Sequence, residues 1–380
     1  MIVKLGDVAF ENRENWTGST EGVPIVGLEH LTPGEITLKE WTSDLKESTF
    51  TKKFRKGQVL LGRRRVYLRK AALAPFDGIC SGDITVIESN PAKLLPELLP
   101  FIIQNDAFFD YAMKGSAGSL SPRVKWAHLA NYTFNLPSLP KQKRLADLLW
   151  AANDLKESYK RLLAASDEMA KSRFVEMFGT NEKCHYAETV SRYANVFGGY
   201  AFKSKDFLHK GVSVIRIGDI DGDYVNIHNA ICFQHDFWES NEAFRVLKGD
   251  LLMAMSGATT GKIGLVLFDQ KALLNQRVAC IRAKNPKWVY FLKTFFHMDW
   301  LTNAILEKSA GSAQPNISIK QIQELSAPAA KEEDIVVFSE FAEQLDKSKA
   351  ALQKSITALD NTIKSLLHKS FSGEEEGNNV

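Results

Sequence analysis

Residues 54–70, FRKGQVLLGRRRVYLRK, and residues 247–264, LKGDLLMAMSGATTGKIG, carry one pattern at two places in the chain. Each has a Lys-Gly pair, then a short apolar run typical of a β-strand, then a polar stretch. The first copy is strongly basic, with nine Lys or Arg and no Asp or Glu from Lys52 to Lys70. The second copy is rich in Ser, Thr and Gly. If the two segments are copies, the chain contains a duplicated domain, and each motif has to be interpreted together with its counterpart in the other copy.

Further landmarks recur in the same order, with partners 189 to 196 residues apart. The pairs are VPIVGLEHL (23–31) with VSVIRIGDI (212–220), GSAGSLS (115–121) with GSAQPNIS (311–318), LPSLPKQKR (136–144) with APAAKEED (327–334), and KSRFVEMFG (171–179) with KSLLHKSFSG (364–373). Two unrelated α/β domains with common turn chemistry are the alternative. The shared order favours a duplication of the whole chain.

The bulk composition is that of an ordinary soluble protein of two or three domains, with 380 residues, 44% hydrophobic, 24% charged and a net charge of +3. The four cysteines have no CxxC spacing, which favours reduced, mostly buried thiols: Cys80, Cys184, Cys232 and Cys280. The N-terminus lacks the apolar core of a signal peptide, and no run of 18 apolar residues predicts a membrane span. We expect a cytoplasmic protein.

Two stretches have the heptad spacing of long amphipathic helices. After Pro140 and again after Glu333, apolar residues recur at alternating steps of three and four, with no Gly or Pro between them. We expect one apolar seam on each helix. The first seam is Leu145, Leu148, Ala152, Leu155, Tyr159, Leu162, Ser166 and Met169; the second is Ile335, Phe338, Ala342, Leu345, Lys349, Leu352, Ile356, Leu359, Ile363 and Leu366.

A narrow seam needs a partner helix. The two helices can pair with each other, or each can pair with a helix of a second chain. We favour pairing within the chain as an antiparallel coiled coil with pseudo-two-fold symmetry, each helix following its own globular α/β (or α+β) domain. Lys349 falls on the seam, where it weakens pairing locally or specifies the register.

Two similar but non-identical domains related in this way would fit a bipartite, non-palindromic DNA target. Basic side chains neutralise phosphates, Arg can read guanine, and Asn or Gln can hold adenine. The DNA contacts predicted in the first copy are Arg63, Arg64, Arg65, Tyr67, Arg69, Lys70, Arg123 and Lys125. Those predicted in the second copy are Ser256, Thr259, Thr260, Lys262, Asn275, Gln276 and Arg277.

Each of these predictions has a plainer alternative. The basic stretch can be a solvated hairpin, and residues 275–277 can be an ordinary turn before a strand. If residues 66–70 form a strand, alternation places Arg65, Tyr67 and Arg69 on one face. The Gly-Ser loops at 115–121 and 311–316 either approach a DNA backbone or connect helix to strand.

No enzyme signature is recognisable. GATTGK (257–262) is not a phosphate-binding P-loop, because three residues separate its glycines where four are needed and Ile263 replaces the Ser or Thr. The histidines show no metal-ligand spacing, and the Asn/Asp-Pro-Pro-aromatic signature of methyltransferases is absent. A coiled-coil scaffold with an incidental basic surface, or a self-contained DNA-modifying enzyme with unfamiliar motifs, are the competing hypotheses.

The chain resembles the specificity subunits of type I restriction-modification systems. The resemblance is carried by LGDVA (5–9), VIRIGDIDGDYV (214–225), KGDLLMAMSGATTGKIG (248–264), GSAQPNIS (311–318) and the two long helices. It implies a target recognition domain at 1–140, a spacer helix at 141–179, a second recognition domain at 180–330, a second helix at 331–373 and an acidic flexible tail at 374–380.

The resemblance also implies a function. A non-catalytic DNA-binding subunit would read a split target in double-stranded DNA and position two methylation subunits, to which restriction subunits can add. S-adenosylmethionine, ATP and magnesium are then expected on those partner subunits, with no cofactor or metal in this chain.

Overall fold

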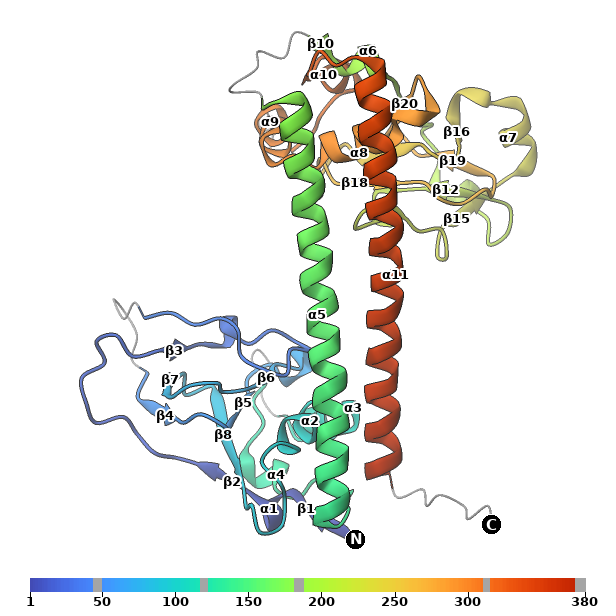
Figure 1. Ribbon diagram of the computed structural model, residues 1–380. Coiled ribbons are helices and arrows are strands. Elements are labelled where there is room, and N and C mark those ends of the chain that lie inside the picture. Colours follow the sequence, from blue (N-terminus) through green and yellow to red (C-terminus); the bar gives the residue numbers. More distant parts are fainter. Residues whose placement is uncertain (44–49, 117–121, 181–187, 310–314, 373–380) are drawn as a thin grey trace, which may run out of the picture. The chain divides into compact units, whose positions relative to one another are not determined.

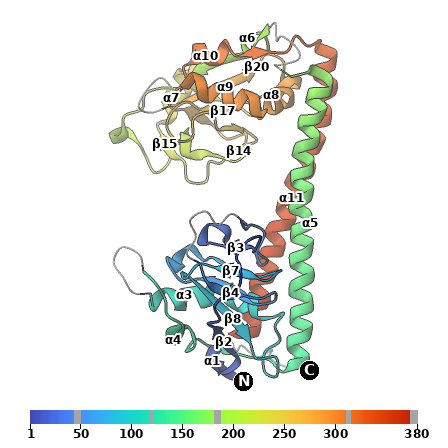
Figure 2. The same ribbon diagram turned by 90° about the vertical axis from the view of Figure 1, so that its left-hand side faces the viewer.

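A computed structural model describes residues 1–43, 50–116, 122–180, 188–309 and 315–372. The chain divides into two compact units. Unit 1 is Met1–Lys160 with Gln353–Val380, and unit 2 is Arg161–Leu352. Two helices of 40 residues, α5 (Leu139–Phe178) and α11 (Glu332–Phe371), contribute one part to each unit. In both Figure 1 and Figure 2, the short elements of each unit gather around its part of α5 and α11.

Unit 1 is built from short strands and helices around a four-stranded sheet of order β2-β8-β5-β6 and a three-stranded sheet of order β3-β7-β4. Its strands are β1 (Ile2–Lys4), β2 (Ala9–Asn12), β3 (Ile25–Val26), β4 (Lys52–Phe54), β5 (Val59–Gly62), β6 (Ala71–Leu73), β7 (Gly78–Cys80), β8 (Ile84–Ser89) and β9 (Thr133–Asn135). Its helices are α1 (Leu5–Val8), α2 (Leu99–Ile103), α3 (Asp106–Lys114) and α4 (Trp126–Leu129), with 3-10 turns η1 (Leu28–His30) and η2 (Val66–Leu68).

Unit 2 has the same plan with additional strands, in sheets of order β11-β20-β17-β18-β14-β13 and β15-β12-β19-β16. Its strands are β10 (Glu188–Thr189), β11 (Ala194–Gly198), β12 (Val212–Ile215), β13 (Ile220–Asp221), β14 (Tyr224–Val225), β15 (Ile231–Phe233), β16 (Arg245–Val246), β17 (Leu251–Ala254), β18 (Ile263–Leu265), β19 (Ala272–Leu274), β20 (Val278–Ala283) and β21 (Ser326–Ala327). Its helices are α6 (Val190–Tyr193), α7 (His235–Ser240), α8 (Val289–Phe296), α9 (Asp299–Ser309) and α10 (Ile319–Gln323), with 3-10 turns η3 (Ser204–Asp206), η4 (Ile217–Asp219), η5 (Glu242–Phe244) and η6 (Pro286–Trp288).

The pairing of strands is the same in both units, which supports the duplication. The order β2-β8-β5-β6 recurs as β11-β20-β17-β18. The parallel pair β3-β7 recurs as β12-β19, and the pair β1-β9 recurs as β10-β21. The sequence partners RKGQVLL and LKGDLLM fall on β5 and β17, so both runs form the third strand of their sheet.

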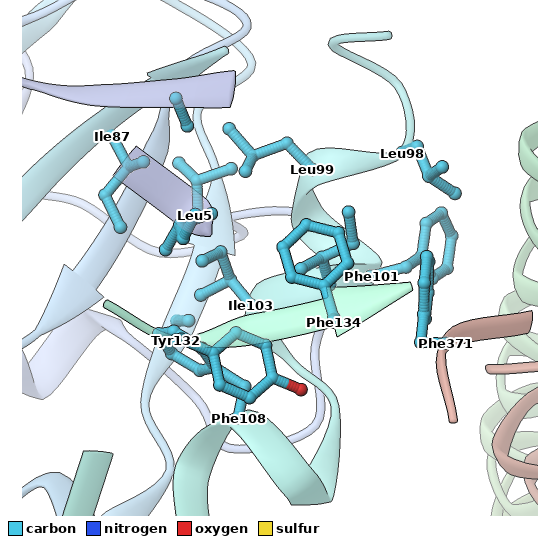
Figure 3. Close-up of a cluster of buried hydrophobic side chains, with 14 of the residues drawn as sticks. Leu5, Ile87, Leu98, Leu99, Phe101, Ile103, Phe108, Tyr132, Phe134 and Phe371 are labelled. Carbon is cyan, nitrogen blue, oxygen red and sulfur yellow. The ribbon is translucent and has the colours of Figure 1, made fainter. Parts of the chain in front are cut away.

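The main sheet of each unit is buried on both faces, which explains why its strands are apolar without a gap. In β5, Val59 and Leu61 face the core shared with the helices, while Leu60 faces the second sheet. In β17 the alternation repeats, with Leu251 on the helix side and Leu252 on the other. Alternating side chains of one strand thus enter two cores. Figure 3 shows the helix-side core of unit 1, where Phe134 meets Phe371 of α11 edge to face at 5.7 Å.

The helices α5 and α11 pair, and in each unit a Lys-Asp ion pair joins them. In unit 1 the Nζ of Lys156 donates to Oδ1 of Asp360 at 3.0 Å, and in unit 2 Lys349 donates to Asp167. From 156 to 167 along α5 and from 360 to 349 along α11, the advance is eleven residues in opposite directions. The pairing is therefore antiparallel. Both pairs also fit the repeat, because Lys349 and Asp360 each lie 193 residues after Lys156 and Asp167.

The predicted seam on α11 coincides with its buried face. Ile335, Phe338, Ala342, Ile356 and Ile363 are buried, and Leu345, Lys349, Leu352, Leu359 and Leu366 are partly buried. On α5 the predicted seam is contradicted at every second member: Ala152, Tyr159 and Ser166 are partly buried, but the members between them are exposed. Its remaining large apolar members are exposed by about half: Leu148 57%, Leu155 43%, Leu162 51% and Met169 48%.

The buried face of α5 is displaced by one residue from the predicted seam. It carries Gln142, Ala146, Leu149, Asn153 and Lys156 in unit 1, and Phe174 and Phe178 in unit 2. The cause is that α5 packs on its own domain as well as on α11, so the face that serves both contacts is buried. Heptad spacing identifies the helix. It does not decide which of two neighbouring apolar residues, which lie on different faces of the helix, is buried.

Hydrogen bonds of a buried glutamine, Gln142, join the start of α5 to the backbone of unit 1. The amide of Gln142 donates to the carbonyl oxygens of Lys93 and Pro137, both at 2.9 Å, and its Oε1 accepts from the Leu95 N–H at 3.0 Å. Pro140 lies in the first turn, where a missing N–H costs nothing.

Two expectations from composition are reflected in the structure. Cys80 and Cys280 are buried and Cys232 is partly buried, all as free thiols, whereas Cys184 lies outside the described residues. Burial raises the pKa of the Cys80 thiol to about 12, which makes it unreactive. In the described part of the chain, no helix combines the length and apolar character needed to cross a membrane. The acidic segment 374–380 also lies outside the described residues.

Candidate nucleic-acid interface

Three segments of unit 1 meet at the ends of the strands of its main sheet. They are the β5–β6 connection (63–70), the turn before β8 (81–83) and residues 122–125, and we call them the first loop cluster. The Arg63 N–H donates to the Asp83 carbonyl oxygen at 2.9 Å, and the Val124 N–H donates to the Arg63 carbonyl oxygen at 3.0 Å. Arg64 and Arg123 face each other as an antiparallel bridge. Backbone bonds thus hold together segments far apart in sequence.

Unit 2 builds an equivalent second loop cluster from residues 255–262, 275–277 and 315–318. The Met255 N–H donates to the Arg277 carbonyl oxygen at 3.0 Å, and the Ile317 N–H donates to the Met255 carbonyl oxygen at 2.9 Å. Ser256 and Asn316 form the matching antiparallel bridge. The connections 63–70 and 255–262 also have the same length, eight residues. All fifteen predicted DNA contacts therefore fall in these two clusters.

Residues 66–70 do not form a strand, so the condition that would place Arg65, Tyr67 and Arg69 on one face is not met. Residues Val66–Leu68 form a single 3-10 turn between two left-handed residues, Arg65 and Arg69, both at φ 51°. Within the described ranges, these are the two residues other than glycine with positive φ. The connection has to close between β5 and β6, and a strand of five residues does not fit such a turn.

The second cluster uses glycine at both of these positions. Gly257 and Gly261 each have φ 85°, and each lies 192 residues after Arg65 and Arg69. Glycine adopts this conformation without cost, whereas a residue with a Cβ pays about 1 kcal/mol. The first cluster therefore holds two strained arginines where its copy holds relaxed glycines.

Several predicted contacts in the first cluster already have partners within the chain. The Asp83 carboxylate forms ion pairs with the guanidinium groups of Arg123 and Arg64, with N···O distances of 2.7 Å and 3.5 Å. The hydrogen bond from Arg123 and the nearby positive charges hold the pKa of Asp83 below its usual range. This carboxylate offsets part of the positive charge, and its two hydrogen bonds with Arg123 fix the direction of that guanidinium group.

Two further cations of the first cluster hold the loop in place. Arg69 pairs with Asp106 and, at 2.8 Å, with Asp110, both on α3. Lys70 donates to the carbonyl oxygen of Leu28 at 2.7 Å.

Other predicted contacts of the first cluster remain open to an incoming molecule. Among the described residues, Arg65 and Lys125 are exposed and have no side-chain ion pair, and Tyr67 is 52% exposed. The Nε of Arg63 is buried and has no hydrogen-bond partner in the part of the chain that the structure describes. Arg63 also lines an open cleft of about 880 Å³ with residues that sequence reasoning had not selected, among them Arg13 and Lys52.

The second cluster presents different chemistry in the same frame. Gln276, Arg277, Thr259 and Lys262 are exposed, while Ser256 is partly buried. Thr260 is buried instead, with its hydroxyl 2.7 Å from the Gly257 carbonyl oxygen, so this predicted contact serves the loop itself.

The turn 275–277 has its own internal cap and an aromatic neighbour. Asn275 accepts the Arg277 N–H on its side-chain oxygen at 3.3 Å. Tyr200, 40% exposed, is bridged to Asn275, and its backbone oxygen accepts the Gln276 N–H at 2.9 Å. Sequence reasoning missed this tyrosine. Most of the Gly-Ser loops, 117–121 and 310–314, lies outside the described residues.

Charge is reversed at one equivalent position of the two clusters. Asp83 lies three residues after β7 and directly before β8. Arg277 lies three residues after β19, the equivalent of β7, and directly before β20. In the first cluster this position neutralises arginines; in the second it adds one. In the described ranges, no group of three His, Cys, Asp or Glu side chains could hold a metal ion.

Comparison with known proteins finds similarity over part of the sequence. Residues 193–359 match the family model of the type I restriction modification DNA specificity domain. A stretch of 169 residues is 24% identical to the type I restriction enzyme EcoDI specificity subunit of Escherichia coli, covering 43% of this chain and 34% of that protein. The chain thus spans about a third of the length of this curated relative.

Solved structures extend the likeness of fold to nearly the whole chain. The S subunit of the type I restriction-modification system from M. genitalium superposes with a TM-score of 0.60 at 13% identity, covering 98% of this chain and 96% of that one. A chain from a study of complex assembly and conformational transition of the type I R-M system gives 0.51 at 18% identity, covering 97% of each. Residues 193–359 are thus similar to the type I restriction modification DNA specificity domain, and the duplicated α/β domains with their paired helices have the fold of the solved S subunit from M. genitalium.

Proposed function

We propose that this chain is the DNA specificity subunit of a type I restriction-modification complex and reads a bipartite, asymmetric target in double-stranded DNA. The observation that carries the proposal is the pair of loop clusters. They share one backbone frame, yet Arg64, Arg65 and Arg123 in the first stand where Ser256, Gly257 and Asn316 stand in the second. One frame with two sets of side chains suits two different base sequences.

The side chains of the clusters divide into two kinds of DNA contact. Cations paired with a carboxylate, such as Arg64 and Arg123 on Asp83, would position the chain on phosphates. Exposed side chains without a partner among the described residues, such as Gln276 and Arg277, are free to meet base edges. Affinity would then depend steeply on salt, while specificity would depend on a few residues.

The exposed stripe on α5, made of Leu148, Leu155, Leu162 and Met169, supports a protein partner. These side chains recur every seven residues and are about half exposed, so they line one face of the helix. Leu148 and Leu155 belong to unit 1, whereas Leu162 and Met169 belong to unit 2. We assign each pair to one of two methylation subunits, because an apolar stripe is the usual core of a protein interface.

The reactions would then be carried out by the partners. The methylation subunits would bind S-adenosylmethionine, and restriction subunits joining the complex would use ATP and magnesium. This chain would place the DNA and perform no chemical step.

The decisive experiment is to co-express the chain with a methylation subunit and map methylated adenines in the host genome. We expect one split motif with a fixed gap. Arg277→Ala should change only one part of that motif. The control Lys347→Ala, which removes an exposed cation on α11 outside the loop clusters, should leave both parts unchanged. Methylation without a motif would support a scaffold, and methylation by the chain alone would indicate a self-contained enzyme; either result overturns the proposal.

Assembly is tested separately. Leu155→Glu should reduce co-purification with the methylation subunit, because a charge replaces an apolar contact. The matched control is Leu306→Glu on α9, a leucine of similar exposure, 45% against 43%, that lies outside the stripe. Equal retention of both variants would remove the stripe from the interface.

A further inference from the structure

Arg65 combines a strained backbone with an unoccupied side chain. Its φ of 51° and ψ of 52° lie in the left-handed region, and its guanidinium has no ion pair or hydrogen bond within the described residues. Arg69 shares the strain, but its side chain is held by Asp106 and Asp110. The strain at Arg65 therefore has no compensation inside the described part of the chain. Strain of this kind persists where the residue serves a function.

The copy in unit 2 shows that the loop itself does not need an arginine there. Gly257 holds the equivalent place, donates its N–H to the Pro315 carbonyl oxygen as Arg65 does to Pro122, and closes the same turn. A Cβ added at Gly257 would meet no described atom within 4 Å. A side chain at this position thus points into open space, where it contributes nothing to packing and is available to a ligand.

The backbone around Arg65 is pinned on both sides. The Arg65 N–H donates to the Pro122 carbonyl oxygen at 2.8 Å, and the Arg65 carbonyl oxygen accepts the Leu68 N–H at 2.9 Å. The left-handed conformation then sets a defined direction for the side chain. A contact to a phosphate tolerates many side-chain directions. A bidentate hydrogen bond to a base edge requires the guanidinium to be held in one direction, which a fixed backbone helps to provide.

We propose that Arg65 is a specificity-determining residue that reads one guanine, through its O6 and N7, in the part of the target taken by unit 1. This rests on the proposed function and adds to it the identity of one base and of the residue that selects it. An arginine guanidinium matches these two acceptors, and the pairing is the commonest specific contact in the major groove. Arg64 and Arg123, held by Asp83, supply the neighbouring phosphate contacts.

The test uses the full chain assembled with its methylation subunits and a randomised duplex library as probe. Arg65→Gly restores the residue of the unit 2 copy, and Arg65→Lys keeps the charge but loses the planar fork. Lys347→Ala is the control, because it removes an exposed cation of α11 that lies outside both loop clusters.

We expect both Arg65 variants to lose about 10- to 100-fold of the preference for guanine at one position in one part of the motif. Every other position should stay unchanged, and Lys347→Ala should keep the whole motif. The unfolding midpoint of Arg65→Gly should not fall below that of the parent chain, because glycine relaxes the turn.

Three results would overturn the assignment. One is an unchanged motif in Arg65→Gly. Another is equal weakening on all sequences that Arg65→Lys restores, which is the signature of a phosphate contact. The third is a lowered unfolding midpoint for Arg65→Gly, which would make Arg65 a structural residue. Failure of the proposed function looks different, since the parent complex would then select no split sequence at all.

Discussion

Replacing Lys349 by methionine tests whether a polar cluster in unit 2 holds its domain on the helix pair. Lys349 of α11 donates to Asp167 of α5 and, at 2.7 Å, to Asp223, which follows β13 in the domain. Lys293 of α8 stands 3.7 Å from the same Asp223 and also pairs with Asp346 of α11. Methionine keeps the length of the side chain but leaves both carboxylates without this cation.

The expected cost follows from how far these groups are buried. The Lys349 side chain is 17% exposed, against 32% for Asp223 and 52% for Asp167. Exposed ion pairs contribute about 0–1 kcal/mol, and removing one partner of a fully buried pair costs about 3–5 kcal/mol. A cluster between these limits should lose about 2 kcal/mol. Burial alone would lower the pKa of Lys349, but the hydrogen bonds to Asp167 and Asp223 outweigh it and raise the pKa.

The assay is urea unfolding, with hydrogen exchange to locate the loss in unit 2, because a chain of two units need not unfold in one step. Lys347→Met, two residues away and 59% exposed beside Glu343, is the control and should change stability by less than about 0.5 kcal/mol. Asp223→Asn combined with Lys349→Met should cost about 1 kcal/mol less than the two single changes together. Equal effects of the Lys347 and Lys349 variants, or strict additivity of the double variant, would refute the cluster as a joint.

Three further predictions follow from buried groups. Phe338→Ala removes a ring with no exposed surface that packs edge to face on Phe174 at 5.4 Å, and should lower the unfolding free energy by about 3–5 kcal/mol in urea titrations. Gln142→Leu strands the Leu95 N–H and two carbonyl oxygens, so the same titration should show a loss of about 3 kcal/mol, with early hydrogen exchange at the start of α5. Burial would raise the pKa of Asp223, but Lys349 and Lys293 hold it below the ordinary 3.8, so stability from this group is complete above that value and is lost as pH falls through the lower folded pKa. Unfolding free energy measured against pH should therefore be flat from neutral to about pH 5 and fall below about pH 4, less steeply in Asp223→Asn.

Much of the loop clusters could be inferred from residues alone, because the duplication aligns them. The pairing of RKGQVLL with LKGDLLM places Arg63–Lys70 and Met255–Lys262 after equivalent strands, and the structure shows equal lengths and matching backbone bonds. Asp83 was missed, although it stands at the position of Arg277 in the repeat. Its ion pairs with Arg64 and Arg123 join segments that are 19 and 40 residues from it in sequence and that meet only after folding.

The sequence by itself determined the duplication, the strand runs and the two long helices, because these depend on local spacing: alternation for strands and heptads for helices. Only the tertiary structure decided which face of α5 is buried. Leu148 and Leu149 are both apolar, and the choice of Leu149 follows from packing α5 on a sheet and on α11 at once. Tertiary structure also decided the left-handed turns at Arg65 and Arg69, since nothing local favours arginine there, and the closure of β5 on β6 imposes them.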